Sequence, residues 1–178
     1  MVFRAPSDGR IKLDRCVVGR LREFAQRDPR ALEAGGVLLG RHISGSGDIV
    51  VDEATTPQPA DRRTRASFHR SREQHQRLIV DAHTRSQGTC GYLGEWHTHP
   101  EPRPSPSGVD LRDWRRRLRA DAVDGRHVLF IIVGTVHVCV WRGDRDANEI
   151  EQLEAIDVID DDSAQDGSCT VDAGGREM

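Results

Sequence analysis

Apolar positions in the first half of the chain follow the short period of β-strands. EAGGVLLGRHI (33–43) and DIVVDEAT (48–55) are strand-like runs on either side of SGSG (44–47), which predicts a β-hairpin. Three more strands are predicted further along the chain, YLGEWHTH (92–99), HVLFIIV (127–133) and VHVCVW (136–141). The second of these is apolar after its first residue, which is typical of a buried central strand.

Segments with helical spacing lie between these strands. IKLDRCVVGRLREFAQRDP (11–29) begins as a short strand and continues as a helix capped by Asp14. A surface helix is predicted over about 68–86, and SGVDLRDWRRRLRADA (107–122) predicts a third helix with an apolar inner face. Helices interleaved with strands, with antiparallel hairpins at both ends, predict an α/β fold.

Length and charge suggest one domain followed by a tail. A chain of 178 residues is long enough for a single domain with its own core. We therefore predict a domain over 1–143 and an acidic, partly disordered tail over 144–178, in which IEQLEAIDVI can add a helix or strand. With no signal peptide and no run of the ~18 apolar residues that span a membrane, we expect a cytoplasmic protein without membrane contacts.

Two histidines stand one residue apart at the end of the predicted strand YLGEWHTH. Side chains two positions apart on a strand project to the same face, so His97 and His99 present their imidazoles side by side. This pair is half of a metal site, or alternatively a solvated pair at a strand end. Asp110 favours the metal site, because the stiff EPRPSPS turn can fold the chain back toward the histidines.

Ser107 and Asp110 also fit a helix cap. A serine followed three residues later by an acidic residue satisfies free N–H groups at the start of a helix. Taken alone, this pattern favours the cap. A helix that begins at Ser107 nevertheless places Asp110 in its first turn, where two nitrogens and one carboxylate can converge.

Three protein ligands with a fourth position for water are typical of catalytic zinc sites. Hydrolysis of an amide also needs a base that moves a proton to the leaving nitrogen. Glu33, at the entrance to AGGVLLG, and Glu95, on the same face as His97 in a regular strand, are both candidates. Spacing alone does not choose between these two carboxylates.

These positions together resemble the JAMM motif of the MPN/JAB1 metalloprotease family. The matching residues are Glu33 before GGVLLG, then His97, His99, Pro100, Ser107 and Asp110. The family fold is a single MPN domain, a curved mixed β-sheet flanked by helices, and it agrees with the predicted order of elements. Glu95 lies outside the motif, which leaves it a contact of the ligand residues or of the substrate.

The resemblance also implies a role for each motif residue. His97, His99 and Asp110 would hold one zinc ion (Zn2+) per chain. Glu33 would be the general base, and Ser107 would help to stabilise the oxyanion. Zinc would be the only cofactor of such an enzyme.

Within the family, ASFHRS and GYLGEWHTHPEPRPSPSGVD are most similar to the deconjugating peptidase of bacterial type II CBASS antiphage operons. That branch implies hydrolysis of a peptide or isopeptide bond that joins a target to the C-terminus of a CD-NTase, in a ubiquitin-like conjugation system. Two alternatives are another JAMM hydrolase that acts on a sulfur-carrier or ubiquitin-like adduct, and an MPN scaffold without catalytic activity.

The segment RDWRRRLR (112–119) adds several arginines to a helix whose apolar face is already used. We interpret them as a solvated helix face, and the net charge of −3 gives little support for nucleic-acid binding. If these arginines do bind a partner, the nearest acidic candidates are the chain's own tail and an acidic C-terminal segment of the substrate.

Overall fold

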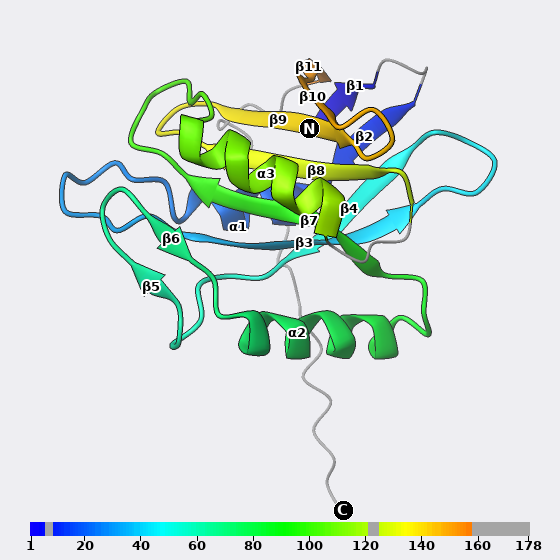
Figure 1. Ribbon diagram of the computed structural model, residues 1–178, viewed down its shortest axis with the longest axis horizontal. Coiled ribbons are helices and arrows are strands. Elements are labelled where there is room, and N and C mark those ends of the chain that lie inside the picture. Colours follow the sequence, from blue (N-terminus) through cyan, green and yellow to red (C-terminus); the bar gives the residue numbers. More distant parts are fainter. Residues whose placement is uncertain (6–8, 121–124, 158–178) are drawn as a thin grey trace, which may run out of the picture.

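A mixed nine-stranded β-sheet forms the body of the protein (Figure 1). The structure is a computed structural model that describes residues 1–5, 9–120 and 125–157. The strand order across the sheet is β10-β9-β8-β7-β3-β4-β2-β1-β11. These strands are β1 (Val2–Arg4), β2 (Arg10–Leu13), β3 (Gly35–His42), β4 (Ile49–Ala54), β7 (Gly91–Thr98), β8 (His127–Val133), β9 (Val138–Asp144), β10 (Glu149–Gln152) and β11 (Glu154–Asp157).

Parallel pairing occurs at two places, between β7 and β8 and between β2 and β4, and the other neighbours pair antiparallel. Three α-helices flank the sheet, α1 (Arg15–Arg22), α2 (Arg72–Arg85) and α3 (Gly108–Ala120). The predicted α/β class is therefore confirmed, as is a single domain built on a curved mixed sheet with flanking helices.

The helices cover both faces of the sheet, and successive side chains along a strand pack alternately against the helices on one face and the other. Leu129 and Ile131 of β8 share a core with α1, whereas Val128 and Phe130 pack under α3. Helix α2 covers Val37 and its neighbours in β3, on the same face as α3. Because β8 is covered on both faces, every residue after its first is buried, as its apolar sequence predicts.

Two element boundaries differ from the prediction. The helix expected from residue 68 begins at Arg72, because Phe68–His69 (β6) pairs with Arg62–Arg63 (β5) and the Ser71 side chain caps the helix by accepting the Gln74 N–H. The preceding helix begins as predicted, since Asp14 accepts the Cys16 N–H, but it ends at Arg22.

The sheet also includes part of the segment that we assigned to the acidic tail. Strand β10 pairs with β9, and β11 pairs with β1 at the opposite edge of the sheet. The rest of that predicted tail, 158–178, lies outside the described residues. Among the residues that the structure describes, no helix combines the length and the apolar character needed to cross a membrane.

A buried polar network ties α2 to the segment that follows β4. His75 is fully buried, and its Nδ1 lies 2.7 Å from Thr55 Oγ1 while its Nε2 lies 3.1 Å from Asp61 Oδ2. Thr55 Oγ1 accepts the Val37 N–H, so its hydroxyl can donate to Nδ1 of His75. Nε2 of the neutral imidazole then donates to the carboxylate of Asp61.

Replacing His75 by alanine should lower the free energy of unfolding by about 3 kcal/mol, because it removes one donor from a buried carboxylate, leaves a buried hydroxyl without its acceptor and opens a cavity. His83→Ala, at an exposed position of the same helix, should cost less than about 1 kcal/mol. Chemical denaturation of both variants measures the difference. Equal losses would show that the network contributes nothing beyond helix packing.

The effect of His75→Ala should also depend on pH. Burial lowers the pKa of His75 below its ordinary value of 6.5, although Asp61 opposes this shift. The neutral imidazole therefore stabilises the fold above pH 6.5, and this contribution is lost as the pH falls toward the lower pKa of the folded state. The gap in stability between wild type and His75→Ala should narrow from pH 8 to pH 5.

Candidate active site

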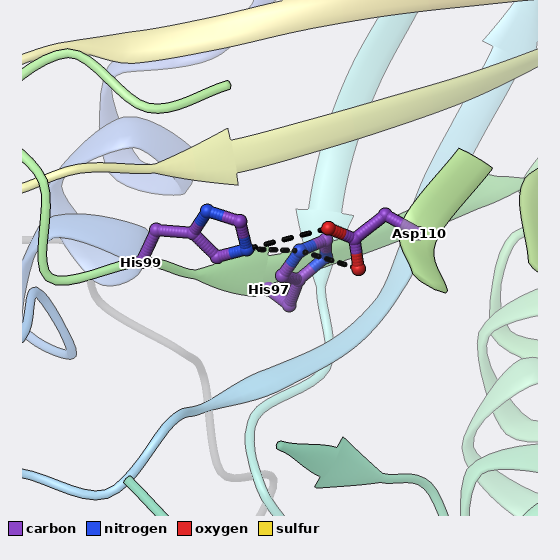
Figure 2. Close-up of side chains that lie close together, drawn as sticks. All are labelled: His97, His99 and Asp110. Carbon is purple, nitrogen blue, oxygen red and sulfur yellow. Dashed lines mark hydrogen bonds and ion pairs between the residues drawn. The ribbon is translucent and has the colours of Figure 1, made fainter. Parts of the chain in front are cut away.

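Three potential metal ligands converge where β7 ends and α3 begins (Figure 2). The Nε2 atoms of His97 and His99 are 3.1 Å apart. Nε2 of His97 lies 3.4 Å from Asp110 Oδ1, and Nε2 of His99 lies 3.5 Å from Oδ2. One ligand atom from each residue lies within 4.8 Å of the other two, so the structure brings together the two nitrogens and the carboxylate selected from the sequence.

The backbone around these residues explains how the chain folds back. His97 pairs with Gly35 of β3 and Ile132 of β8, and the His99 N–H donates to Val133 O at 3.0 Å. The turn that follows is fixed to the β8–β9 loop, because Thr135 N donates to Glu101 O and His137 N donates to Pro102 O, both at 2.9 Å. This anchoring returns the chain to start α3 beside the histidines.

Asp110 belongs both to the helix cap and to the cluster. Its Oδ2 accepts the Ser107 N–H at 2.7 Å, and Ser107 Oγ accepts the Asp110 N–H at 3.2 Å, which is the reciprocal pattern of a capping box. The same carboxylate faces the two imidazoles (Figure 2). The two interpretations of Ser107 and Asp110 are therefore compatible, since the cap fixes the rotamer that the cluster requires.

Charge in the cluster is shared between the carboxylate and the imidazoles. Burial by itself would raise the pKa of Asp110, but hydrogen bonds from His97, His99 and Ser107 hold that pKa far below its usual range. For His99, burial would lower the pKa, and the neighbouring Asp110 outweighs it, so the pKa is raised. The carboxylate is ionised at neutral pH and offers a negative ligand.

Glu33 lies just before β3 and is buried, with a relative exposure of 8%. Its N–H donates to Thr64 O at 2.7 Å, and its carbonyl accepts Nε of Arg63 at 2.7 Å, so the β5–β6 hairpin holds its backbone. Gly35 permits this arrangement, because a Cβ there would collide with the ring of Phe68. Burial raises the pKa of Glu33, and His97 and His99 partly offset that rise.

Gln26 is a buried residue near the site that the sequence did not reveal. Its Nε2 donates to Ala31 O at 3.1 Å and to Arg65 O at 2.8 Å. Its Oε1 accepts the hydroxyl of Thr98, whose oxygen accepts the Ala34 N–H. Gln26 thus connects the segment that carries Glu33, the β5–β6 hairpin and the residue between the two histidines. A single glutamine in a loop has no motif by which the sequence could identify it.

Glu95 lies on the face of β7 that carries His97, as the regular strand predicts. Its Oε2 is 2.8 Å from Nε of Arg117 and 3.7 Å from Nη2 of Arg70. The interpretation of the α3 arginines as a solvated face is therefore wrong for Arg117, which turns toward the sheet and is 25% exposed. Sequence periodicity could not show this, because the partner carboxylate is on another element.

A fold with an open cluster of two imidazoles and a carboxylate, and with a buried glutamate beside it, defines a metallohydrolase. The model of a family described as prokaryotic homologues of the JAB domain matches residues 15–148. The chain belongs to this family. The predicted membership in the JAMM/MPN family is thereby confirmed.

Three similar proteins are named CD-NTase/cGAS isopeptidase. The one from Pseudomonas aeruginosa is 42% identical over 113 residues, which are 64% of this chain and 70% of that protein. The one from Vibrio cholerae is 35% identical over 88% of this chain and 96% of that protein. The one from Escherichia coli is 31% identical over 86% of this chain and 94% of that protein. These relatives agree with the CBASS branch to which the sequence is most similar.

Among solved structures, protein DSY2949 from Desulfitobacterium hafniense superposes with a TM-score of 0.52 at 20% identity, over 80% of this chain and 88% of that one. This similarity supports the fold alone.

Proposed function

We propose that the protein is a zinc-dependent isopeptidase that removes a target conjugated to the C-terminus of a CD-NTase. The observation that carries this proposal is the convergence of His97, His99 and Asp110 within 4.8 Å beside buried Glu33. The relatives that align over most of the chain are named CD-NTase/cGAS isopeptidase, and this name supports a CD-NTase conjugate as the substrate.

The donor set fits zinc. Two imidazole nitrogens and one carboxylate are ligands that zinc takes in hydrolytic sites, and the cluster includes no fourth protein ligand among the described residues. His97, His99 and Asp110 would hold one ion per chain. When bound, zinc supplies a Lewis acid for the scissile carbonyl and lowers the pKa of water to about 7.

The chain's own residues then move the protons. Glu33 accepts a proton from the attacking water and delivers it to the leaving nitrogen, a role suited to a carboxylate whose pKa burial has raised. Ser107 stabilises the developing oxyanion. Its hydroxyl also accepts the Asp110 N–H, so the residue is held at the edge of the cluster.

Fusion substrates test the proposed reaction. A reporter fused after the C-terminus of a cognate CD-NTase should be released, whereas the same reporter fused to an unrelated protein should remain intact. Equal cleavage of both fusions would refute the substrate assignment and favour a JAMM hydrolase of other specificity. Cleavage of neither fusion by the zinc-loaded protein would indicate a scaffold.

A further inference from the structure

A cavity of about 280 Å³ lies beside the candidate metal ligands and is lined largely by charged side chains. Glu33, His97 and Asp110 form the part of its wall that belongs to the site already described. The other ionised lining residues are Arg62, Arg70, Arg116, Arg117, Glu95 and Asp113. Over the whole lining the four guanidinium groups balance four carboxylates, but Glu33 and Asp110 lie with the candidate ligands and Arg116 is paired with Asp113 at 3.1 Å. Away from the candidate ligands, Glu95 is therefore the carboxylate left to face Arg62, Arg70 and Arg117, so positive charge is in excess there.

Two of these arginines are held in place by one carboxylate. Arg70 follows β6 and Arg117 comes from α3, and both lie within 4.0 Å of Oε2 of Glu95, at 3.7 and 2.8 Å. Their side chains are only 13% and 25% exposed, so water screens their charge weakly. Positive charge that is fixed and partly desolvated attracts an anionic ligand more strongly than freely moving surface arginines do.

Arg70 also has a donor that the described part of the protein does not satisfy. Its Nε is buried and has no hydrogen-bond partner among the described residues. A buried donor without an acceptor destabilises a fold, and a ligand oxygen that reaches it removes this cost. This atom belongs to a residue that lines the cavity, so the missing acceptor can come from the ligand.

The position of the cavity relates it to the scissile bond. Glu95 is two residues from His97 along β7, a distance of roughly 7 Å, and Arg117 is two helical turns from Asp110, or about 10 Å. An extended peptide advances about 3.3 Å per residue. A side chain that reaches this part of the cavity therefore belongs to a residue two or three positions from the bond that is cut.

We propose that the cavity is a specificity subsite for an aspartate or glutamate of the conjugate, two or three residues from the scissile bond. Arg70 and Arg117 bind the carboxylate, and Glu95 positions the two guanidinium groups. A neutral or basic residue would leave two guanidinium groups, Arg70 and Arg117, with the single carboxylate of Glu95 as their counter-charge. This inference rests on the proposed isopeptidase function and adds a requirement on its substrate.

A panel of fusion substrates tests the subsite. Each of the four residues on either side of the cleaved bond is set in turn to glutamate, glutamine or lysine. At one position two or three residues from the bond, glutamate should give a kcat/KM about tenfold or more above glutamine, with lysine lowest. Arg70→Gln should reduce this ratio to nearly one, mainly through KM, and Arg70→Glu should reverse it in favour of lysine.

Arg119→Gln is the matched control, because Arg119 is an exposed residue of the same helix as Arg117 and does not line the cavity. This variant should keep the full preference for glutamate. Absence of any positional preference, or a preference that survives in Arg70→Gln, would overturn the subsite. A triple variant in which Asp160, Asp161 and Asp162 are changed to asparagine tests the chain's own acidic segment as the occupant. If this variant raised kcat/KM for every fusion alike, that segment and not the substrate would fill the subsite.

Failure of the proposed function has a different signature. If no fusion is cleaved, calorimetric binding of the glutamate and glutamine fusions to the intact protein decides the question. One outcome is that the glutamate fusion binds more tightly than the glutamine fusion, with the difference abolished in Arg70→Gln. That result supports the subsite even though the proposed reaction is refuted. Equal binding of the two fusions, or no binding of either, would refute both.

Discussion

Glu33→Ala should lower kcat by at least about 10²-fold and leave zinc binding unchanged, because it removes the proposed proton acceptor and none of the three candidate metal ligands. Glu33 lies in the wall of the cavity beside His97 and Asp110 but outside the cluster of three ligands. Its side chain is buried by the fold before any substrate arrives, and its backbone is held by Thr64 and Arg63. Initial rates at matched zinc occupancy measure the loss.

Glu95→Ala is the matched control for this loss, since it removes a carboxylate from the same cavity. The variant should retain measurable turnover, because Glu95 contacts Arg70 and Arg117 and its loss disturbs substrate binding more than proton transfer. A rise in KM with a modest change in kcat is expected. An active Glu33→Ala beside an inactive Glu95→Ala would reverse the roles that we propose for the two residues.

Loss of any one of the three candidate metal ligands should remove zinc and activity together. His97→Ala, His99→Ala and Asp110→Ala should each bind far less than the one zinc ion per chain expected of the wild type, and each should be inactive. With two ligands left, the site no longer offers the three protein donors of a catalytic zinc centre. Metal analysis of the purified proteins, with Arg119→Gln as the control, measures occupancy.

The fold should survive these three substitutions. The side chains of His97, His99 and Asp110 are 11%, 14% and 17% exposed and lie at the ends of their elements, outside the apolar core. Asp110→Ala has an additional cost of about 1 kcal/mol, because the helix loses its capping box. Circular dichroism therefore separates loss of metal from loss of structure. Undiminished zinc in all three variants would remove this site assignment.

Local patterns were sufficient to predict the main strands and helices, and they failed where an element has no period. Strands β5 and β6 contain two residues each, too few to show alternation, and they are stabilised by pairing with each other and by contact with Gly35. For the same reason the start of α2 was predicted too early. The sequence could not identify Gln26, because its three hydrogen-bond partners are distributed over separate segments.

Local geometry was enough to select the three candidate metal ligands, because two histidines on one strand face and an aspartate in the first helical turn follow from short-range sequence patterns. The same local patterns did not show whether Glu33 or Glu95 is the candidate general base. The tertiary structure distinguished them through strand register, since β3 runs antiparallel to β7 with Gly35 opposite His97 and Val37 opposite Glu95. Glu33, two residues before Gly35, therefore lies at the end of the sheet where the histidines converge. Glu95 comes two residues before His97 in β7 and lies between Arg70 and Arg117, which belong to two other segments.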